Sequence, residues 1–343
     1  MASDVAQGTM KAAVVHAPGG PEVYHLEQIP IPKPQPGWVL FRVKAFGMNR
    51  SELFTRQGFS GADVKFPRVL GIEAAGEVVE VAPDGSDVRF EKGDFVAACM
   101  GGMGRIFDGG YAEYTCVPAK QLQKLDKSLV ERLGWEVVGA SPEMLQTAYG
   151  ALFKGLRLEA GQSLLIRGGT SSIGLSAAAI ARHKFGDKVV IASTTRKSNR
   201  EQFLKEKGAD KVFIDGGKIA NDVKAVFPRG VDKVLELVGA TTLEDSLLCT
   251  AKFGIVCMVG MVGNKWTIDN FEPMGAIPTC VSLTTYGGDV IDFLETPIND
   301  LLKQVVEGEI SIPLGRKFKL DDIVEAARVQ EENSAAGKIV VLP

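Results

Sequence analysis

The chain has 343 residues and a formal net charge of −3, with 45% apolar and 24% charged residues. This length predicts two domains, and the composition is typical of a soluble globular protein. The slightly acidic balance gives no general attraction for nucleic acid or an anionic membrane, so we expect neither partner. No apolar stretch reaches the roughly 18 residues that span a bilayer, and the first residues lack the regions of a signal peptide. We therefore expect a cytoplasmic protein.

The five cysteines are odd in number and lie well apart in the sequence, at Cys99, Cys116, Cys249, Cys257 and Cys280. This spacing predicts neither a disulfide framework nor a zinc knuckle, and buried, reduced thiols are expected.

The first part of the chain has the pattern of a polar N-terminal extension followed by short strands. Residues 1–9 are small and polar, which predicts a disordered extension. From Met10 onward, Val39, Phe41 and Val43 alternate with other residues, after prolines that forbid helix. The pattern predicts a small, irregular β-barrel, and we assign residues 10–134 and 281–343 to this first domain.

Residues 135–280 show strands that alternate with helical stretches, which is typical of a doubly wound parallel sheet. The expected strands are 163–166, 189–193, 211–214, 233–237 and 255–259. The fold class is therefore α/β. Ligands bind at the carboxyl ends of such strands, so these ends are predicted to form one binding site. The end residues are Thr194, Thr195, Arg196, Val238, Gly239, Gly260 and Met261.

A Gly/Ser-rich turn joins the first of these strands to an alanine-rich helix that is expected to begin near Ser172. Small residues let a backbone approach a diphosphate, and the helix start directs free N–H groups at the anion. The pattern is a degenerate G-x-G-x-x-G with serine at its middle position, and an ordinary strand-to-helix turn is the alternative. The predicted nucleotide-binding residues of the turn are Gly169, Thr170, Ser171, Ser172, Ile173 and Gly174.

The end of the second strand predicts which dinucleotide is preferred. NAD-selective sites usually place a carboxylate about 20 residues beyond the turn, whereas a 2′-phosphate requires cations and hydroxyls. Here the window holds Arg196, Lys197 and Arg200 and no carboxylate. Cations at a helix start are unfavourable without an anion, so we predict NADP(H) as cofactor, bound by Arg196 and Arg200.

Five short motifs carry a resemblance to a known family. They are Gly-Met-Asn-Arg-Ser-Glu at 47–52, Gly-Ile-Glu-Ala-Ala-Gly at 71–76, Gly-Asp-Phe-Val at 93–96, Gly-Gly-Tyr-Ala-Glu-Tyr at 109–114 and Gly-Lys-Ile-Val at 337–340. In this order, with barrel, nucleotide domain and return segment, they resemble the medium-chain dehydrogenase/reductase superfamily. The resemblance implies a GroES-like catalytic barrel and a Rossmann domain.

The zinc enzymes of that superfamily place metal ligands where this chain has Asn49, Ile72 and Glu143. Asn49 and Ile72 supply neither thiolate nor imidazole, so no metal site is expected. What remains resembles the zinc-independent quinone oxidoreductase and enoyl-reductase-like branch, although Phe54 stands where a tyrosine is usual. The resemblance implies hydride transfer from NADPH to a quinone or to the C=C bond of an enone or enoyl substrate.

The resemblance also implies roles for particular residues. Asn49, Ser51, Tyr111 and Tyr286 are the catalytic candidates, while Arg50, Thr147 and Lys338 join the cofactor-binding set. The pocket for a small hydrophobic carbonyl or quinone is expected to be lined by Phe54, Met100, Met103 and Ile106, with Met100 to Gly104 as a flexible segment. A homodimer is expected from the same resemblance.

Two other functions remain compatible with the sequence. One is a metal-free carbonyl or alcohol oxidoreductase that uses Ser51 as its acid. The other is a non-catalytic NADPH-binding scaffold.

Overall fold

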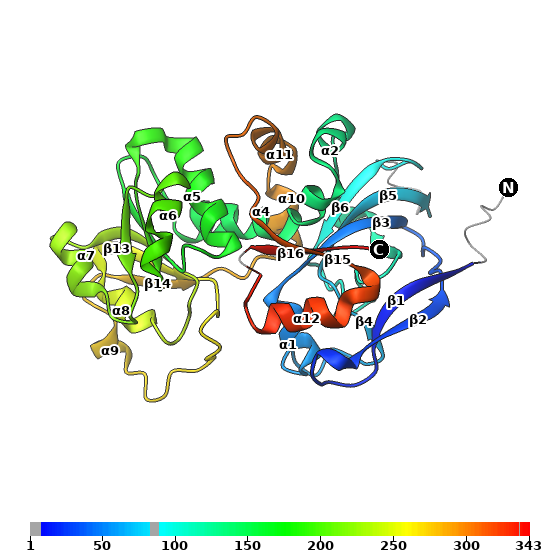
Figure 1. Cartoon of the computed structure of the whole chain (residues 1–343), viewed down its shortest axis with the longest axis horizontal. Coiled ribbons are helices and arrows are strands. Elements are labelled where there is room, and N and C mark those ends of the chain that lie inside the picture. The colour runs from blue at the N-terminus through cyan, green and yellow to red at the C-terminus, as the bar shows by residue number, and fades with distance from the viewer. Residues whose placement is uncertain (1–7, 83–88, 336) are drawn as a thin grey trace. The chain divides into compact units, whose positions relative to one another are not determined.

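The computed structural model describes residues 8–82, 89–335 and 337–343, and the chain divides into two compact units (Figure 1). The first unit comprises Met1–Gln146, Gly288–Gly308 and Ile312–Pro343, and the second comprises Thr147–Gly287 and Glu309–Ser311. The extension expected at residues 1–9 falls mostly outside the described residues. Across the described ranges, no helix combines the length and apolar character needed to cross a bilayer.

The first unit contains two sheets. A three-stranded sheet has the order β2-β1-β4, with β1 (Thr9–Val15), β2 (Tyr24–Pro30) and β4 (Arg68–Val69). A larger sheet has the order β15-β16-β3-β5-β6-β8, with β7 also paired to β3. Its strands are β3 (Trp38–Met48), β5 (Glu73–Val81), β6 (Phe95–Cys99), β7 (Tyr114–Pro118), β8 (Leu122–Lys124), β15 (Leu314–Lys319) and β16 (Lys338–Leu342).

Strand β3 is the centre of this sheet and is buried more completely than its sequence suggests. Phe41 and Val43 are buried as the alternation predicts, but Leu40 on the other face is also only 1% exposed. Strand β3 pairs with β5, β7 and β16, and Leu40 packs in the same hydrophobic core as Phe41 and Val43. A side chain at Gly76 of β5 would meet the carbonyl oxygen of Arg42, so the two backbones approach closely only because glycine is present.

The helices of the first unit are short. They are α1 (Arg50–Arg56), α2 (Lys127–Leu133), α3 (Trp135–Gly139), α10 (Val290–Glu295), α11 (Ile298–Val306) and α12 (Ile323–Glu331), while α4 (Pro142–Gly150) runs from this unit into the second. Helix α3 packs on β3, β5 and β16, which is why the first unit extends beyond the expected boundary at residue 134. The return segment ends in β16, which pairs antiparallel with β3 (Figure 1).

The second unit is a six-stranded parallel sheet of order β11-β10-β9-β12-β13-β14. Its strands are β9 (Ser163–Arg167), β10 (Val190–Thr195), β11 (Lys211–Ile214), β12 (Val231–Glu236), β13 (Thr250–Met258) and β14 (Ser282–Thr285). Its helices are α5 (Ser172–Phe185), α6 (Glu201–Glu206), α7 (Ala220–Val226), α8 (Leu243–Leu248) and α9 (Pro273–Ala276). This is the strand order of a Rossmann fold, with the topological switch point between β9 and β12.

All five strands expected in this region are present, and helix α5 begins at Ser172 as predicted. The unit continues to Gly287 because β14, which was not predicted, pairs with β13 and completes the sheet. Short 3-10 turns (Pro21–Val23, Ala119–Gln121, Gly186–Lys188, Ser198–Arg200 and Leu320–Asp322) and one π-helical turn (Ala151–Gly155) connect these elements.

The cysteines are all unpaired, as expected, but they are not all buried. Cys280 is exposed and Cys116 is partly exposed, whereas Cys99, Cys249 and Cys257 are buried. The expectation of buried thiols was therefore wrong for Cys280, which lies in the connection just before β14, outside the sheet core.

Candidate functional site

The turn between β9 and α5 has the geometry that close backbone approach requires. A side-chain carbon at Gly169 would lie 1.8 Å from Ser193 Oγ, and one at Gly174 would lie 2.8 Å from the carbonyl oxygen of Gly168. Ser171 caps the helix, since its hydroxyl accepts from the backbone N–H of Gly174 at 3.1 Å. The N–H groups of the first helical turn therefore begin at a fixed, tightly packed edge of the sheet, which is a ready anion site.

Strand β10 supports this turn and then becomes exposed. Thr194 is buried and holds the turn in place. Its side-chain oxygen accepts a hydrogen bond from Gly168 N at 3.0 Å, and its carbonyl oxygen accepts one from Gly169 N at 3.1 Å. Two residues later the chain reaches the surface. Arg196 and Lys197 are exposed to solvent, and neither makes an ion pair within the described part of the chain. Arg200 is half-buried, with its guanidinium over the ring of Phe203.

The neighbouring strand ends also lie close together. A side-chain carbon at Gly260 would lie 2.4 Å from the carbonyl oxygen of Leu237, and one at Gly239 would lie 2.8 Å from Met261 Sδ. The structure therefore brings the predicted residues after β12 and β13 to one edge of the sheet, together with the glycine turn.

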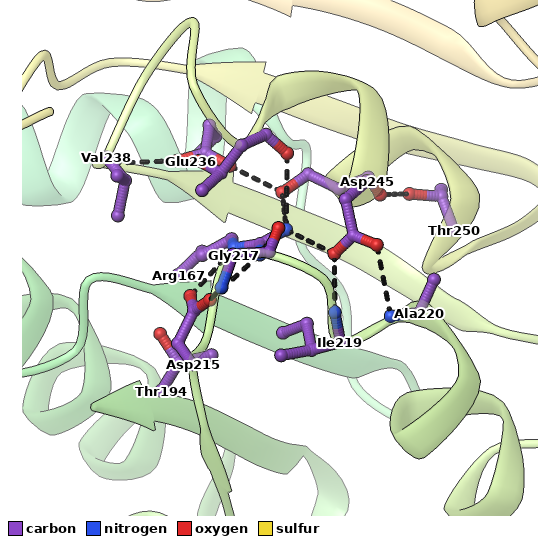
Figure 2. A network of polar contacts seen from close by, with 12 residues as sticks. Arg167, Thr194, Asp215, Gly217, Ile219, Ala220, Glu236, Val238, Asp245 and Thr250 are labelled. Atoms are coloured by element: carbon purple, nitrogen blue, oxygen red, sulfur yellow. Dashed lines mark hydrogen bonds and ion pairs between the residues drawn. The ribbon is translucent and has the colours of Figure 1, made fainter. Parts of the chain in front are cut away.

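Beneath this edge lies a buried charge network centred on Arg167, the last residue of β9 (Figure 2). Its guanidinium is fully buried and donates to both carboxylate oxygens of Asp215, at 2.9 and 3.0 Å. It also donates to Asp245 Oδ2 at 2.7 Å, to Ser246 Oγ at 3.1 Å and to the carbonyl of Gly217 at 3.0 Å. The donors of the planar fork are thus matched by acceptors from several segments.

Glu236 extends the network to the end of β12. Its carboxylate accepts from the hydroxyl of Ser246 and from the backbone N–H groups of Val238 and Gly239, at 2.7 and 3.0 Å (Figure 2). Burial raises the pKa of Glu236 despite these bonds. For Asp215, burial acts to raise the pKa, but the bonds and charge of Arg167 outweigh it and hold the pKa below its ordinary value. The network therefore links the turn, the β11 end and the β12 end.

The sequence interpretation missed this network, although one signal was present. Arg167 closes an otherwise apolar strand directly before the glycine turn, and a charge in such a place needs a buried partner. The partners are Asp215 and Asp245, which lie 48 and 78 positions away.

A second buried network occupies the first unit, around Asn49. Asn49 follows β3 and caps α1, where Glu52 Oε2 accepts from its backbone N–H at 2.9 Å. Its side-chain nitrogen donates to Glu73 Oε1 at 2.9 Å and to Glu52 Oε1 at 3.2 Å, and its side-chain oxygen accepts from Lys338 Nζ. Both polar atoms of the Asn49 amide are therefore engaged within the protein.

Lys338 is held in the same network. Its ammonium lies 2.8 Å from Glu73 Oε1 and 3.2 Å from Glu143 Oε2, in addition to its bond to Asn49. These three acceptors match the three N–H donors of the ammonium, and the cofactor-binding role predicted for Lys338 stays a prediction.

Glu52 is the acid of this network whose pKa is shifted most clearly. Its side chain is buried, at 1% exposed, and lies near the carboxylate of Glu73. Burial raises the pKa of Glu52 to about 7, opposed by hydrogen bonds from Ile72 N and Asn49. The hydroxyl of Ser51 lies 3.4 Å from Glu52 Oε2, so a group that exchanges its proton near neutral pH adjoins the predicted catalytic hydroxyl.

A cavity of about 230 Å³ lies in the first unit beside this network. Its wall is formed by Ile72, Met100, Gly101, Gly102, Met103, Arg105, Gly288, Asp289 and Val290. Met100 and Gly101 both adopt positive φ angles, which turns the predicted flexible segment around the cavity. Met100 and Met103 thus lie on the wall, as predicted for a pocket.

The catalytic candidate Tyr111 and the expected wall residues Ile106 and Phe54 lie elsewhere in the first unit. Tyr111 is fully buried in the barrel core, stacked on Phe46 at 4.6 Å, and its hydroxyl has no hydrogen-bond partner among the described residues. Burial raises the pKa of Tyr111 well above its usual range. Ile106 is 61% exposed, and neither Ile106 nor Phe54 lies on the cavity wall.

The remaining candidates are placed as follows. Arg50 is partly buried in the first turn of α1, and burial lowers its pKa. Thr147 is buried at the start of the second unit. In that unit the hydroxyl of Tyr286 lies against Gly150, where a side-chain carbon would be only 1.9 Å from it.

Comparisons with known proteins agree with this architecture. Residues 35–127 match the alcohol dehydrogenase GroES-like domain, and residues 207–341 match a family described as zinc-binding dehydrogenase. The chain is 31% identical to quinone oxidoreductase of Mus musculus and 28% identical to that of Homo sapiens, with 98% of each chain covered in both cases. The solved structure of a mycobacterial protein complexed with NADPH is similar at a TM-score of 0.84 and 25% identity, covering 97% of this chain and 100% of that one.

The chain belongs to the medium-chain dehydrogenase/reductase superfamily, in its quinone oxidoreductase-like branch. The predicted family and the predicted fold class are therefore confirmed.

One family description implies zinc, but the residues do not fit that ion. Within the described ranges, no three His, Cys, Asp or Glu side chains are placed to hold a metal. Asn49, Glu73 and Glu143 offer only oxygen atoms, and the ammonium of Lys338 already lies among them. Zinc prefers nitrogen and sulfur ligands, so the residues present here do not suit it.

The Arg167 network predicts a large loss of stability when its cation is removed. Arg167→Met leaves the buried carboxylates of Asp215 and Asp245 unpaired, so we expect the free energy of unfolding to fall by about 3–5 kcal/mol. Urea unfolding monitored by circular dichroism measures this. Lys205→Met, which removes an exposed pair with Glu201, should cost less than about 1 kcal/mol. If both variants lowered the free energy of unfolding by a similar small amount, the network would not have the stabilising effect that is predicted for it.

Glu52 predicts a pH dependence of stability. Its pKa is about 7 in the folded chain against an ordinary value of 4.5, so the folded state binds the proton more tightly. The contribution of Glu52 to the free energy of unfolding is therefore constant below about pH 4.5 and falls as the pH rises through 7, by about 3 kcal/mol in total. Urea unfolding between pH 5 and 8 should show this fall.

The matched variants for this measurement are Glu52→Gln and Glu131→Gln, the latter at an exposed position on α2. Glu52→Gln should flatten the pH dependence whatever its absolute stability, because the titrating group is gone. Glu131→Gln should leave the slope unchanged. An unchanged slope in Glu52→Gln would show that other groups titrate instead.

Proposed function

We propose that this chain is a zinc-independent, NADPH-dependent oxidoreductase that transfers a hydride to a quinone or to the C=C bond of an α,β-unsaturated carbonyl compound. The observation that carries the proposal is the tight turn at β9–α5 with exposed cations at the end of β10 and no carboxylate among them. NADPH in the mycobacterial relative and quinone oxidoreductase as the name of the curated relatives support it.

The cofactor site proposed for this chain follows from these positions. Gly169, Thr170, Ser171, Ser172, Ile173 and Gly174 would receive the pyrophosphate at the start of α5, since free N–H groups and the positive end of the helix dipole favour an anion. Arg196 and Arg200 would receive the 2′-phosphate, because guanidinium groups bind phosphate through paired hydrogen bonds. Thr194, Thr195, Val238, Gly239, Gly260 and Met261 would border the rest of the nucleotide.

When bound, NADPH supplies a hydride from its nicotinamide ring. The protein's part is to orient the substrate, exclude water and deliver a proton. The cavity beside Met100 and Met103 is mostly apolar and suits a flat, hydrophobic substrate, with Arg105 and Asp289 as the charged residues of its wall. Ser51 is the proposed proton donor, since its hydroxyl adjoins Glu52 and no metal is required for the step.

The contact between Ser51 and Glu52 also favours a second candidate, a metal-free carbonyl reductase in which Ser51 protonates the alkoxide. A non-catalytic NADPH-binding scaffold is the outcome that remains if turnover is absent. A homodimer and a cytoplasmic location accompany the proposal.

The first test measures nucleotide preference. We expect NADPH to bind at least about tenfold more tightly than NADH, because each charge-assisted hydrogen bond to the phosphate contributes about 1.5–3 kcal/mol. The double variant Arg196→Glu/Arg200→Glu should lose that preference while NADH affinity stays within about threefold. Fluorescence titration of the reduced nucleotides measures both constants.

The control for this test is Lys224→Glu/Lys252→Glu, which makes the same change in net charge at exposed positions on α7 and β13. It should retain the preference. Equal affinities of the unaltered protein for NADPH and NADH would refute the phosphate assignment.

The second test measures turnover. NADPH oxidation should be faster with 1,4-quinones or enones than with saturated ketones and aldehydes, and prior dialysis against a chelator should leave the rate unchanged. Ser51→Ala should lower kcat at least about tenfold with little change in NADPH affinity. Preference for saturated carbonyls would support the carbonyl reductase, and tight NADPH binding without turnover would support the scaffold.

A further inference from the structure

The side chains around Lys338 form a complete shell around one positive charge. Asn49 comes from the junction of β3 and α1, Glu73 from the start of β5 and Glu143 from the first turn of α4. Lys338 opens β16 and contributes the cation. Three segments that are distant in sequence therefore direct oxygen atoms at a single point.

The stoichiometry of this shell is matched. An ammonium group has three N–H donors and no acceptor, and here it meets three acceptors: Asn49 Oδ1, Glu73 Oε1 at 2.8 Å and Glu143 Oε2 at 3.2 Å. The side chains of Lys338 and Glu73 are 4% and 0% exposed. No donor of the ammonium is left for an additional partner.

The backbone is built to admit this pair. Gly47 lies on β3 opposite Val340 of β16, and a side-chain carbon at Gly47 would lie 2.3 Å from Glu73 Oε1 and 2.6 Å from Lys338 Cε. Any other residue at this position would push the ion pair apart.

Charge balance makes a cation necessary at this point. Two carboxylates removed from water are strongly unfavourable unless they are paired and hydrogen-bonded. Burial alone lowers the pKa of Lys338, but Glu73 and Glu143 outweigh it and raise the pKa above its ordinary value. The lysine is therefore charged throughout the physiological pH range.

We propose that Lys338 is a built-in cation of this oxygen shell, and that its ammonium occupies the position a divalent metal ion would take and so keeps the shell closed to metals. Lys338 thereby supplies a positive charge in place of a metal ion. Because this charge belongs to a side chain of the protein, no metal has to be taken up. It also orients Asn49 by holding its side-chain oxygen. This role is independent of which substrate the protein reduces.

The proposal predicts that removing the ammonium exposes a site for a hard, oxygen-binding cation. Lys338→Ala leaves both the space and the carboxylates, so it should bind about one Mn²⁺ per chain when MnCl₂ is added. Its unfolding temperature should then rise by at least about 4 °C at 1 mM MnCl₂. The unaltered protein should show neither binding nor a shift, measured by electron paramagnetic resonance of free Mn²⁺ and by thermal unfolding.

Two matched variants separate this role from a general structural one. Lys338→Met removes the charge but keeps the space filled, so it should be destabilised and should not bind Mn²⁺. Lys338→Ala/Glu73→Gln/Glu143→Gln removes the carboxylates as well, so it should regain stability relative to Lys338→Ala and should not bind Mn²⁺ either.

Several outcomes would overturn the proposal. One is stoichiometric Mn²⁺ binding by the unaltered protein at the affinity of Lys338→Ala. Another is a folded Lys338→Ala chain that binds no Mn²⁺. If Lys338→Ala folds only in the presence of MnCl₂, the proposal is supported. If it stays unfolded with MnCl₂ while the triple variant folds, the metal cannot replace the ammonium and the proposal fails.

Discussion

Burial of charge at the ends of strands is the constraint on which this structure depends. Each unit removes carboxylates from water at the place where its chain segments converge, and each supplies one cation that holds several of them. In the first unit, Lys338 ties the last strand to segments near residues 49, 73 and 143. In the second unit, Arg167 ties the first strand to the loop after β11 and to helix α8. The hydrophobic cores fix which strands pair, and these two cations fix where the loops between them lie.

The two cations differ in a way that follows from their chemistry. Arginine presents a planar fork, and Arg167 uses it to grip Asp215 through two parallel bonds while reaching Asp245 and Ser246 with the remaining nitrogen. Lysine presents a compact point charge, and Lys338 stands at the centre of three oxygens. The first geometry suits a flat layer under the glycine turn, and the second suits a closed shell. Exchange of arginine and lysine between the two positions would therefore be costly at both.

The sequence allowed the Rossmann unit to be predicted well because its signals are local. Each strand is a short apolar run, the glycine turn joins adjacent elements, and Ser171 caps the helix that follows it. The barrel was harder to predict from the sequence. Strand β3 is buried on both faces, whereas alternating apolar residues predict burial of one face only. Neither charge network could be derived, because periodicity describes neighbours in sequence whereas Lys338 and Asn49 lie 289 positions apart. Tyr111 illustrates the same limit, since only the curvature of the barrel decides that its ring stacks on Phe46 rather than facing the cavity.

The saturation of the Asn49 network constrains where chemistry can occur. A substrate oxygen that develops negative charge needs a donor that is not already engaged, and the Asn49 amide and the Lys338 ammonium direct their hydrogens at Glu52, Glu73 and Glu143. The donors of these two groups are therefore engaged within the protein. Ser51 differs, because its hydroxyl contact with Glu52 is long, at 3.4 Å, and lies at the edge of the network. Under the proposed function, a proton that leaves Ser51 would be replaced from Glu52, whose pKa of about 7 suits exchange at neutral pH. The network would then take part in proton transfer through Glu52 rather than through Glu73 and Glu143, which contact the ammonium of Lys338.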